Sequence, residues 1–345
     1  LIIMDEPTSA LSDAEVERLF ETVRGLRERG VAIVYISHKM EEIYAICDRI
    51  TVLRDGAYVG TAAASELPTE QLIHWMVGRQ IAQLFPKRHV ESGDTVLQVE
   101  SLTLAAADGT DRKLVDDVSL SVRAGEILGI AGLRGSGASE LMGCIFGSYG
   151  RRRQGTVRVR GEDATSASPK AAIGHGIAML TNDRKATGLV LPMSVLHNMT
   201  LPSLPALAPW GIVRRRAEQD AAEPLRKSLD IRAASVDVEV NALSGGNQQK
   251  VALAKWLMAD PSVLLLDEPT RGIDVGAKAE IYELMNRLAA AGKAIVLTTS
   301  ELPELLAMSD RIVVMHRGRV TAQFAAAQAT QESIMAAAME AEARG

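Results

Sequence analysis

The sequence is poor in aromatic residues, in cysteine and in long apolar runs, and each shortage excludes a class of protein. Aromatic residues make up 3% of the 345 residues, which argues against a platform that stacks single-stranded nucleic acid. The two cysteines, Cys47 and Cys144, lack metal-ligand spacing, so neither a disulfide framework nor a zinc site is expected. No run approaches the roughly 18 to 20 apolar residues that span a bilayer, so a transport role would need a separate membrane subunit.

The sequence also lacks an excess of basic residues. Lys and Arg number 38 against 43 Asp and Glu, and the net charge of −5 gives no footprint for a nucleic-acid partner. The short run Arg151-Arg152-Arg153 is interpreted as a solvated loop. Hydrophobic residues at 47% and charged residues at 23% are ordinary for a globular protein, and the length allows two domains. A reducing cytoplasm fits this composition.

One tetrad, Asp-Glu-Pro-Thr, occurs twice, at residues 5–8 and 267–270, each time directly after an aliphatic run. An apolar run that ends in two carboxylates is typical of a buried strand whose Asp faces Mg²⁺ and whose Glu polarises a water. A single copy could also be a strand that enters a turn, since Pro and Asp favour turns. The surroundings repeat as well, with 31–37 answering 294–300, which predicts a duplicated domain rather than a solenoid.

A glycine-rich loop, residues 132–139, follows the first strong core strand at 126–131 and precedes an apolar helix at 140–146. This order is the context that a P-loop requires, because loop N–H groups and the helix N-terminus can hold phosphate oxygens. A glycine-rich turn without a ligand is the alternative. The glycines that would let the backbone approach the phosphates are Gly132, Gly135 and Gly137.

The loop departs from the P-loop pattern at one position. Ser139 stands where a hydroxyl would bind Mg²⁺, but Ala138 occupies the place of the expected lysine. A lysine contact to phosphate is worth about 1.5 to 3 kcal/mol, so its loss should weaken nucleotide binding roughly 10- to 100-fold. Arg134 is a further candidate to approach the phosphates.

Residues 243–250, Leu-Ser-Gly-Gly-Asn-Gln-Gln-Lys, indicate the family. A capping Ser, two glycines and a helix from about residue 247 to 258 together suit an anion. The segment resembles the signature sequence of ABC-type ATPases, which contacts the γ-phosphate of ATP held by an opposite domain. The resemblance assigns ATP binding here to Ser244, Gly245, Gly246 and Gln248.

The resemblance covers essentially the whole chain and is closest to the tandem ATP-binding subunits of bacterial importers of ribose, xylose and galactose. Supporting stretches are 76–79, 182–190 and 267–278. It implies an α/β P-loop NTPase fold, with a mixed sheet flanked by helices and a helical subdomain that carries the signature. It also implies four segments: the remainder of a first ABC domain at 1–61, a linker at 62–94, a second ABC domain at 95–330 and a helical tail at 331–345.

The resemblance also implies roles for single residues: Mg²⁺ support for Asp5, Asp267 and Ser139, water activation for Glu6 and Glu268, and contact with the γ-phosphate for the switch histidine His38. Two more positions depart from the family pattern. Glu301 is aligned with the switch histidine in the second half, and Asn182 with a Gln that links the site to the permease. The carboxylate of Glu301, in the place of a switch histidine, would repel a γ-phosphate.

We therefore expect two unequal sites. One would join Asp5, Glu6 and His38 to the signature segment and to a P-loop upstream of Leu1, where the chain reads as truncated. The other would join the loop at 132–139 to Asp267 and Glu268, and is expected to bind nucleotide weakly or to act structurally. The chain alone is expected to be inactive.

The expected function is that of an ATP-hydrolysing subunit, with ATP and Mg²⁺ as cofactors, that energises import of a monosaccharide. Its expected partners are membrane permease subunits, indirectly a periplasmic sugar-binding protein, and a paired ABC domain within or between chains. Its expected location is the cytoplasmic face of the cell membrane. The alternatives are a soluble ABC ATPase that acts on ribosomes or DNA, and an inactive fragment that serves only as an interaction module.

Overall fold

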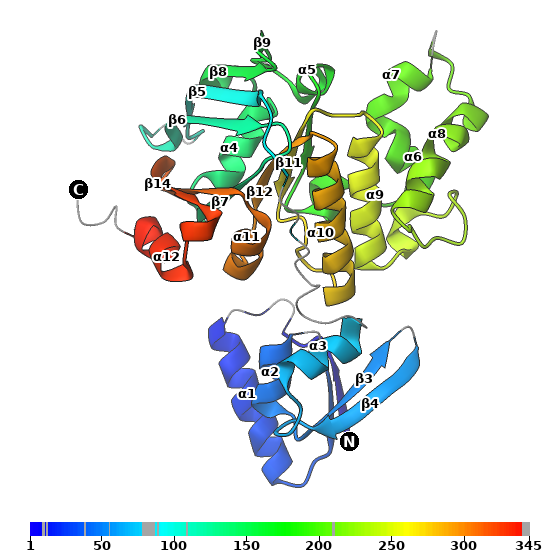
Figure 1. The fold of residues 1–345 in the computed structure, drawn as a ribbon. Helices are drawn as coiled ribbons and strands as arrows, with labels where there is room; N and C mark the ends of the chain where they lie inside the picture. Colours follow the sequence, from blue (N-terminus) through cyan, green and yellow to red (C-terminus); the bar gives the residue numbers. More distant parts are fainter. Residues whose placement is uncertain are drawn as a thin grey trace. The chain divides into compact units, whose positions relative to one another are not determined.

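The computed structural model describes residues 1–8, 11, 13–37, 39–54, 56–77, 87, 90–107, 110–208 and 211–339. The chain divides into two compact units (Figure 1). Unit 1 comprises Leu1–Leu84 with Asp274–Ala279, and unit 2 comprises Phe85–Ile273 with Glu280–Gly345. None of the helices in these described ranges is both long and apolar enough to cross a bilayer.

Unit 2 is built on a six-stranded sheet with the order β10-β11-β12-β7-β13-β14. Neighbouring strands run parallel except for β14, which is antiparallel to β13. The central strands are buried on both faces, as the continuous apolar runs of parallel strands predict. The strands are β7 (Ile127–Gly132), β10 (Ile177–Leu180), β11 (Val263–Asp267), β12 (Ala294–Thr298), β13 (Arg311–His316) and β14 (Arg319–Ala325).

A second, antiparallel sheet of unit 2 has the order β6-β5-β8-β9. Its strands are β5 (Thr95–Ala105), β6 (Lys113–Arg123), β8 (Arg153–Val159) and β9 (Glu162–Asp163). The basic run expected to be a solvated loop is only partly so, because Arg153 already belongs to β8. The alternation of that strand turns Arg153 inward, where it is 9% exposed and donates from Nη2 to the Ser166 carbonyl at 2.7 Å.

The helices of unit 2 flank the main sheet or gather in a helical group (Figure 1). Within that group α6 packs on α8 and α9, and α8 packs on α9. The α/β fold with a mixed sheet and a helical group is therefore confirmed. The helices are α4 (Ala138–Ile145), α5 (Pro169–Gly174), α6 (Val195–Thr200), α7 (Leu204–Leu207), α8 (Arg215–Ser228), α9 (Gly245–Leu257), α10 (Val275–Ala290, of which residues 275–279 are grouped with unit 1), α11 (Leu302–Met308) and α12 (Gln331–Met339).

Unit 1 contains a parallel pair, β1 with β2, and an antiparallel pair, β3 with β4. Its core cluster unites residues of β3, α2, α3 and the connection before α3, namely Ile43, Ile50, Val52, Leu67 and Leu72. The elements are β1 (Ile2–Asp5), α1 (Asp13–Glu28), β2 (Ile33–Ile36), α2 (Met40–Ile46), β3 (Arg49–Arg54), β4 (Ala57–Ala63) and α3 (Thr69–Val77).

The elements of unit 1 recur further along the chain at one constant displacement. From Asp5 to Asp267 is 262 positions, and the same displacement carries α1 onto α10, α2 onto α11, β3 onto β13 and β4 onto β14. It also carries α3 onto α12, although α3 lies within the segment expected to be a linker. Because Leu72 of α3 is fully buried in the unit 1 cluster, this part of the segment packs as an element of unit 1.

Candidate nucleotide-binding site

The glycine-rich loop connects the end of β7 to the start of α4. Gly135 and Gly137 both lie in the left-handed region, with φ of +84° and +96°. A Cβ on Gly137 would collide with the carbonyl oxygen of Leu114, so the close passage of these two segments requires glycine there. A Cβ on Gly135 would meet nothing within 4 Å, so the loop is open at that point. An open loop at a helix N-terminus has the shape that an anion site needs.

Asp267 ends β11 at the same edge of the sheet as this loop. Thr298, the last residue of the adjacent β12, donates from Oγ1 to Asp267 Oδ1 at 2.6 Å. Burial raises the pKa of Asp267 above its ordinary value, and hydrogen bonds from the Thr298 and Ser139 hydroxyls offset only part of that rise. The structure therefore brings together Ser139 and Asp267, two of the predicted Mg²⁺ ligands.

The next residue, Glu268, which is predicted to activate water, has a left-handed backbone conformation with a φ of +53°. Its backbone N–H donates to the Thr298 carbonyl at 3.0 Å, and its Oε2 accepts from Ser300 Oγ at 3.2 Å. The pKa of Glu268 lies above its ordinary value. Burial raises this pKa most, the charge of Asp267 raises it further, and the hydrogen bond from Ser300 offsets part of the rise. A left-handed conformation costs a non-glycine residue about 1 to 2 kcal/mol.

Unit 1 has the same local geometry. Glu6 has a φ of +45°, and its N–H donates to the Ile36 carbonyl at 2.9 Å. Asp5, which precedes it, ends β1 and is exposed. The left-handed conformation of the glutamate thus occurs in both tetrads.

A buried glutamate holds each tetrad to the end of the next strand, and sequence reasoning missed it. In unit 2, Glu304 of α11 is fully buried, and its Oε2 accepts from Thr270 Oγ1 at 2.7 Å and Thr299 Oγ1 at 3.1 Å. The threonine of the tetrad is thus fixed to the segment that follows β12. The two hydrogen bonds to one buried carboxylate oxygen tie these segments together.

The equivalent glutamate of unit 1 is Glu42, 5% exposed, on α2. It accepts from Thr8 Oγ1 at 2.6 Å and Ser37 Oγ at 3.1 Å, and Lys39 Nζ lies 2.9 Å from Oε1. Burial alone would raise the pKa of Glu42, but hydrogen bonds from Thr8 and Lys39 lower it below its ordinary value. The signal that could have found this glutamate is its recurrence at the displacement that relates the tetrads.

The strand registers correct the expected alignment of Glu301 with the switch histidine. Ser37 Oγ accepts from the N–H of Lys39 at 3.1 Å, and Thr299 Oγ1 accepts from that of Glu301 at 3.1 Å. Glu301 is therefore the counterpart of Lys39. The residue in the place of His38 is Ser300.

The misalignment by one residue arose because both strands are apolar runs. The pairs Asp5 with Ile36 and Asp267 with Thr298 fix the true register. His38 itself lies outside the described residues, so its predicted contact with a γ-phosphate stays a prediction.

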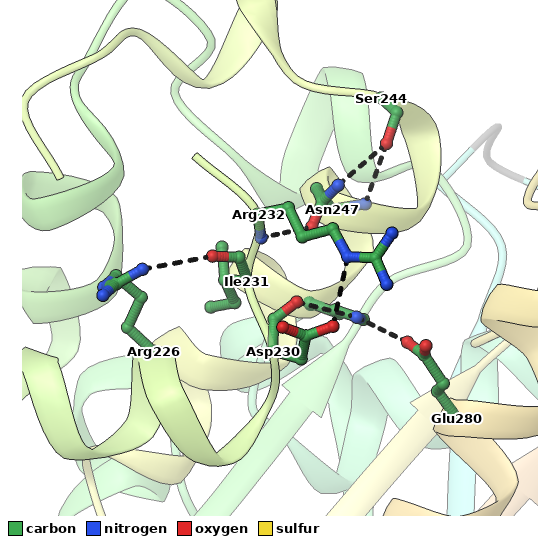
Figure 2. Close-up of polar contacts among 8 residues, drawn as sticks. Arg226, Asp230, Ile231, Arg232, Ser244, Asn247 and Glu280 are labelled. Carbon is green, nitrogen blue, oxygen red and sulfur yellow. Dashed lines mark hydrogen bonds and ion pairs between the residues drawn. The ribbon is translucent and has the colours of Figure 1, made fainter. Parts of the chain in front are cut away.

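The signature segment begins α9 within a polar network (Figure 2). Ser244 is the N-cap, and its Oγ accepts from Asn247 N at 3.5 Å and Asn247 Nδ2 at 3.0 Å. Asn247 Oδ1 in turn accepts from the backbone N–H of Arg232 at 2.8 Å. Lys250, one turn on, pairs with Glu280 and donates to the Asp230 carbonyl at 2.9 Å. The loop at 230–232 is thereby fixed against the start of the helix.

Gln248, predicted to bind ATP, points inward. It is 6% exposed, and its Nε2 donates to the carbonyls of Val240 and Leu243, both at 3.2 Å. Its side chain therefore supports the loop before the helix, and its predicted contact with ATP stays a prediction. Ser244 and Asn247 are the side chains of the segment that lie at the helix start.

The donor atoms at the loop suit a hard cation. Ser139 and Asp267 supply hydroxyl and carboxylate oxygens, which are the ligand types of Mg²⁺. No group of three or more His, Cys, Asp and Glu side chains gathers anywhere in the described part of the chain. A Mg²⁺ ion at a nucleotide needs only one or two protein ligands, because phosphates and waters supply the others.

A buried lysine on α9 gives a pH-dependent prediction. Lys255 is 7% exposed and donates to the Gly188 carbonyl, and burial lowers its pKa from 10.5 to about 8. Below pH 8 the lysine is protonated in both the folded and the unfolded chain, and the free-energy cost of burying its charge is present in full. Between pH 8 and 10.5 the unfolded chain binds a proton that the folded chain has released, so the free energy of unfolding rises with pH.

Urea denaturation of the wild type and Lys255→Met should reveal this effect. We expect the free energy of unfolding of the wild type, minus that of the variant, to increase as the pH rises above about 8. A difference that stays constant from neutral pH to about pH 10 would contradict the assignment.

Comparison with known proteins places these features. Residues 115–271 match the family described as "ABC transporter". The chain is 51% identical over 337 residues to the ribose import ATP-binding protein RbsA of Geobacillus kaustophilus, covering 98% of this chain and 67% of the relative. It is 46% identical over 335 residues to the xylose import ATP-binding protein XylG of Thermoanaerobacter pseudethanolicus, covering 97% and 66%. The chain thus spans about two thirds of the length of these relatives.

Solved structures support the fold. An ATP-binding cassette, MJ0796, in a dimeric post-hydrolysis state with ADP and phosphate aligns with a TM-score of 0.59 at 22% identity, covering 67% of this chain and 98% of that one. A nucleotide-free cassette from an ABC transporter aligns with a TM-score of 0.57 at 24% identity, covering 67% and 91%. At these identities the likeness concerns the fold alone.

Proposed function

The chain belongs to the ABC transporter family of ATP-binding proteins, and from this we propose that it binds and hydrolyses ATP to energise bacterial import of a monosaccharide. One observation carries the proposal: Ser139 and Asp267 meet at the edge of the sheet where the open glycine-rich loop begins α4. The names of the relatives, which include ribose and xylose import proteins, support the substrate class.

The proposed chemistry is phosphoryl transfer to water, which relies on positioning and on stabilising charge. Mg²⁺, held by the hydroxyl of Ser139 and the carboxylate of Asp267, would neutralise charge on the phosphate oxygens. The loop N–H groups bind and orient the phosphates. A tetrad glutamate, Glu6 or Glu268, orients the attacking water and accepts its proton.

We propose that the two tetrads do not contribute equally. Ala138 deprives the loop of a cation, so a site built on unit 2 holds ATP weakly. The tetrad of unit 1, together with His38 two positions after β2, belongs to the site that hydrolyses ATP, which an intact P-loop would complete. Ser244, Gly245 and Gly246 serve a nucleotide held by an opposite ABC domain.

The proposed partners follow from the same assignment. A membrane permease would receive the movement that ATP drives, and a periplasmic sugar-binding protein would act through it indirectly. ABC domains would pair within or between chains, and no nucleic acid would take part. The protein would lie on the inner face of the cell membrane as a peripheral subunit.

Purification from membranes tests this function. The tagged protein should bring down a membrane permease, and reconstitution with that permease should give ATP hydrolysis that rises when sugar and its binding protein are added. Association with ribosomes or DNA instead would favour a soluble ABC ATPase. A permease complex that hydrolyses no ATP would leave only the role of an interaction module.

A further inference from the structure

One arginine joins three segments of unit 2 that are far apart in the sequence. Arg184 begins a short turn of π-helix, Arg184–Gly188, after β10. Its Nη1 donates to the Arg271 carbonyl at 2.8 Å and its Nη2 to the Gly272 carbonyl at 3.1 Å. We propose that Arg184 is a positioning residue that holds the start of the signature helix in register with residues 271–272, just after the tetrad. This role rests on the proposed function.

The same guanidinium reaches the signature helix. Arg184 Nε lies 3.5 Å from Gln248 Oε1, at the limit of a hydrogen bond. A Cβ on Gly245 would lie 2.8 Å from Arg184 Nη2 and 3.1 Å from the Gly272 carbonyl, so the guanidinium lies directly against the backbone of the signature. A larger residue at 245 would therefore push against the Arg184 guanidinium and the Gly272 carbonyl, and one or both would have to shift.

The geometry requires an arginine rather than any cation. The guanidinium is a planar fork, and here its three nitrogens contact three different acceptors at once. Burial lowers the pKa of Arg184, while the charge of Asp183 raises it. The group stays charged at physiological pH, because a guanidinium is not deprotonated in proteins. A lysine would present a single ammonium and could not bridge the same acceptors.

The turn that carries Arg184 is itself fixed. Asp183 Oδ1 accepts from the N–H groups of Lys185 at 3.0 Å and Ala186 at 2.9 Å. At the other end of the turn, the Gly188 carbonyl accepts from Lys255 of α9. Arg184 therefore projects from a rigid base, which is what a positioning residue needs.

Arg184 links the start of the signature helix to the segment after the tetrad, and the proposed function gives these two segments different roles. Under the proposed function, the tetrad of a domain works on its own nucleotide, whereas its signature works on a nucleotide held by the opposite domain. Gln249 adds a second tie, since its Nε2 donates to the Pro269 carbonyl at 2.6 Å. A shift of the segment at 269–272 would therefore be passed to the start of α9 through two side chains.

Hydrogen exchange on the chain itself tests the role without relying on ATP hydrolysis. In Arg184→Ala, amide exchange in peptides covering 243–250 and 268–273 should rise at least about 10-fold, as expected when one contact of about 1.4 kcal/mol is lost, while β7 stays unchanged. Arg184→Lys should fail to restore protection, because it cannot bridge the acceptors. Lys185→Ala, an exposed neighbour on the same turn, is the control.

Exchange that is unchanged in Arg184→Ala, or that rises uniformly through unit 2, would overturn the proposal. In the intact protein, Arg184→Ala should lower kcat for ATP with little change in KM. A variant that is merely unstable would instead lose ATP turnover in proportion to its loss of folded protein. If no variant or wild type hydrolyses ATP, the proposed function fails, but the exchange pattern still decides the positioning role.

Discussion

Replacing Glu6 by glutamine should lower ATP turnover of the intact protein by at least about 100-fold, the usual contribution of a general base. Glutamine can still hold a water through its amide, but it cannot accept the proton that the water loses. The tetrad geometry favours this role, since Glu6 is held in a left-handed conformation at the end of β1. Steady-state phosphate release at saturating ATP measures the effect.

Glu268→Gln is the matched control, because Glu268 shares the tetrad and the left-handed conformation. We expect it to change turnover by less than about threefold, since removing a base from a site that does not limit turnover leaves the overall rate almost unaltered. Equal losses in the two variants would mean that both tetrads hydrolyse ATP. A loss in Glu268→Gln alone would reverse the assignment.

Introducing the absent lysine should strengthen nucleotide binding. Ala138→Lys is expected to lower the Kd of this chain for Mg-ATP by about 10- to 100-fold, the effect of one charge-assisted contact to phosphate. Ala138 is the first residue of α4 and is only partly buried, so a longer side chain has room. Fluorescence titration with a labelled ATP analogue measures the change.

Leu133→Lys controls for charge alone, because Leu133 is 43% exposed and lies in the same loop but away from the helix start. We expect it to improve binding by less than about threefold, the effect of one exposed charge in water. If both variants gained equally, a general electrostatic effect would explain the result. No gain in Ala138→Lys would mean that the loop does not hold phosphates as proposed.

The residues that could be predicted from the sequence are those that form motifs of adjacent positions, such as the glycine-rich loop and the helix cap. A loop that passes close to other backbone needs glycine, as Gly137 does against Leu114, and a helix that starts in the open needs a cap, as α9 does at Ser244. Both demands leave patterns of adjacent residues. The order of strand, loop and helix could therefore be predicted.

The misses have different physical causes. Glu304 was missed because a single acidic residue on a helix is usually solvated, and only the fold shows that Thr270 and Thr299 surround it. Arg184 was missed because two of its partners are backbone carbonyls, which leave no trace in the sequence. The register at Ser300 was missed because a slip of one residue between apolar strands is invisible without their pairing.

The central claim is that one of two nucleotide sites is competent and the other impaired, and counting bound ATP tests it most directly. Equilibrium dialysis of the intact Glu6→Gln protein with labelled ATP and Mg²⁺ would trap nucleotide without hydrolysis. We predict one ATP bound tightly per chain, and any second bound about 10- to 100-fold more weakly. Two ATP molecules bound per chain with the same Kd would contradict the claim.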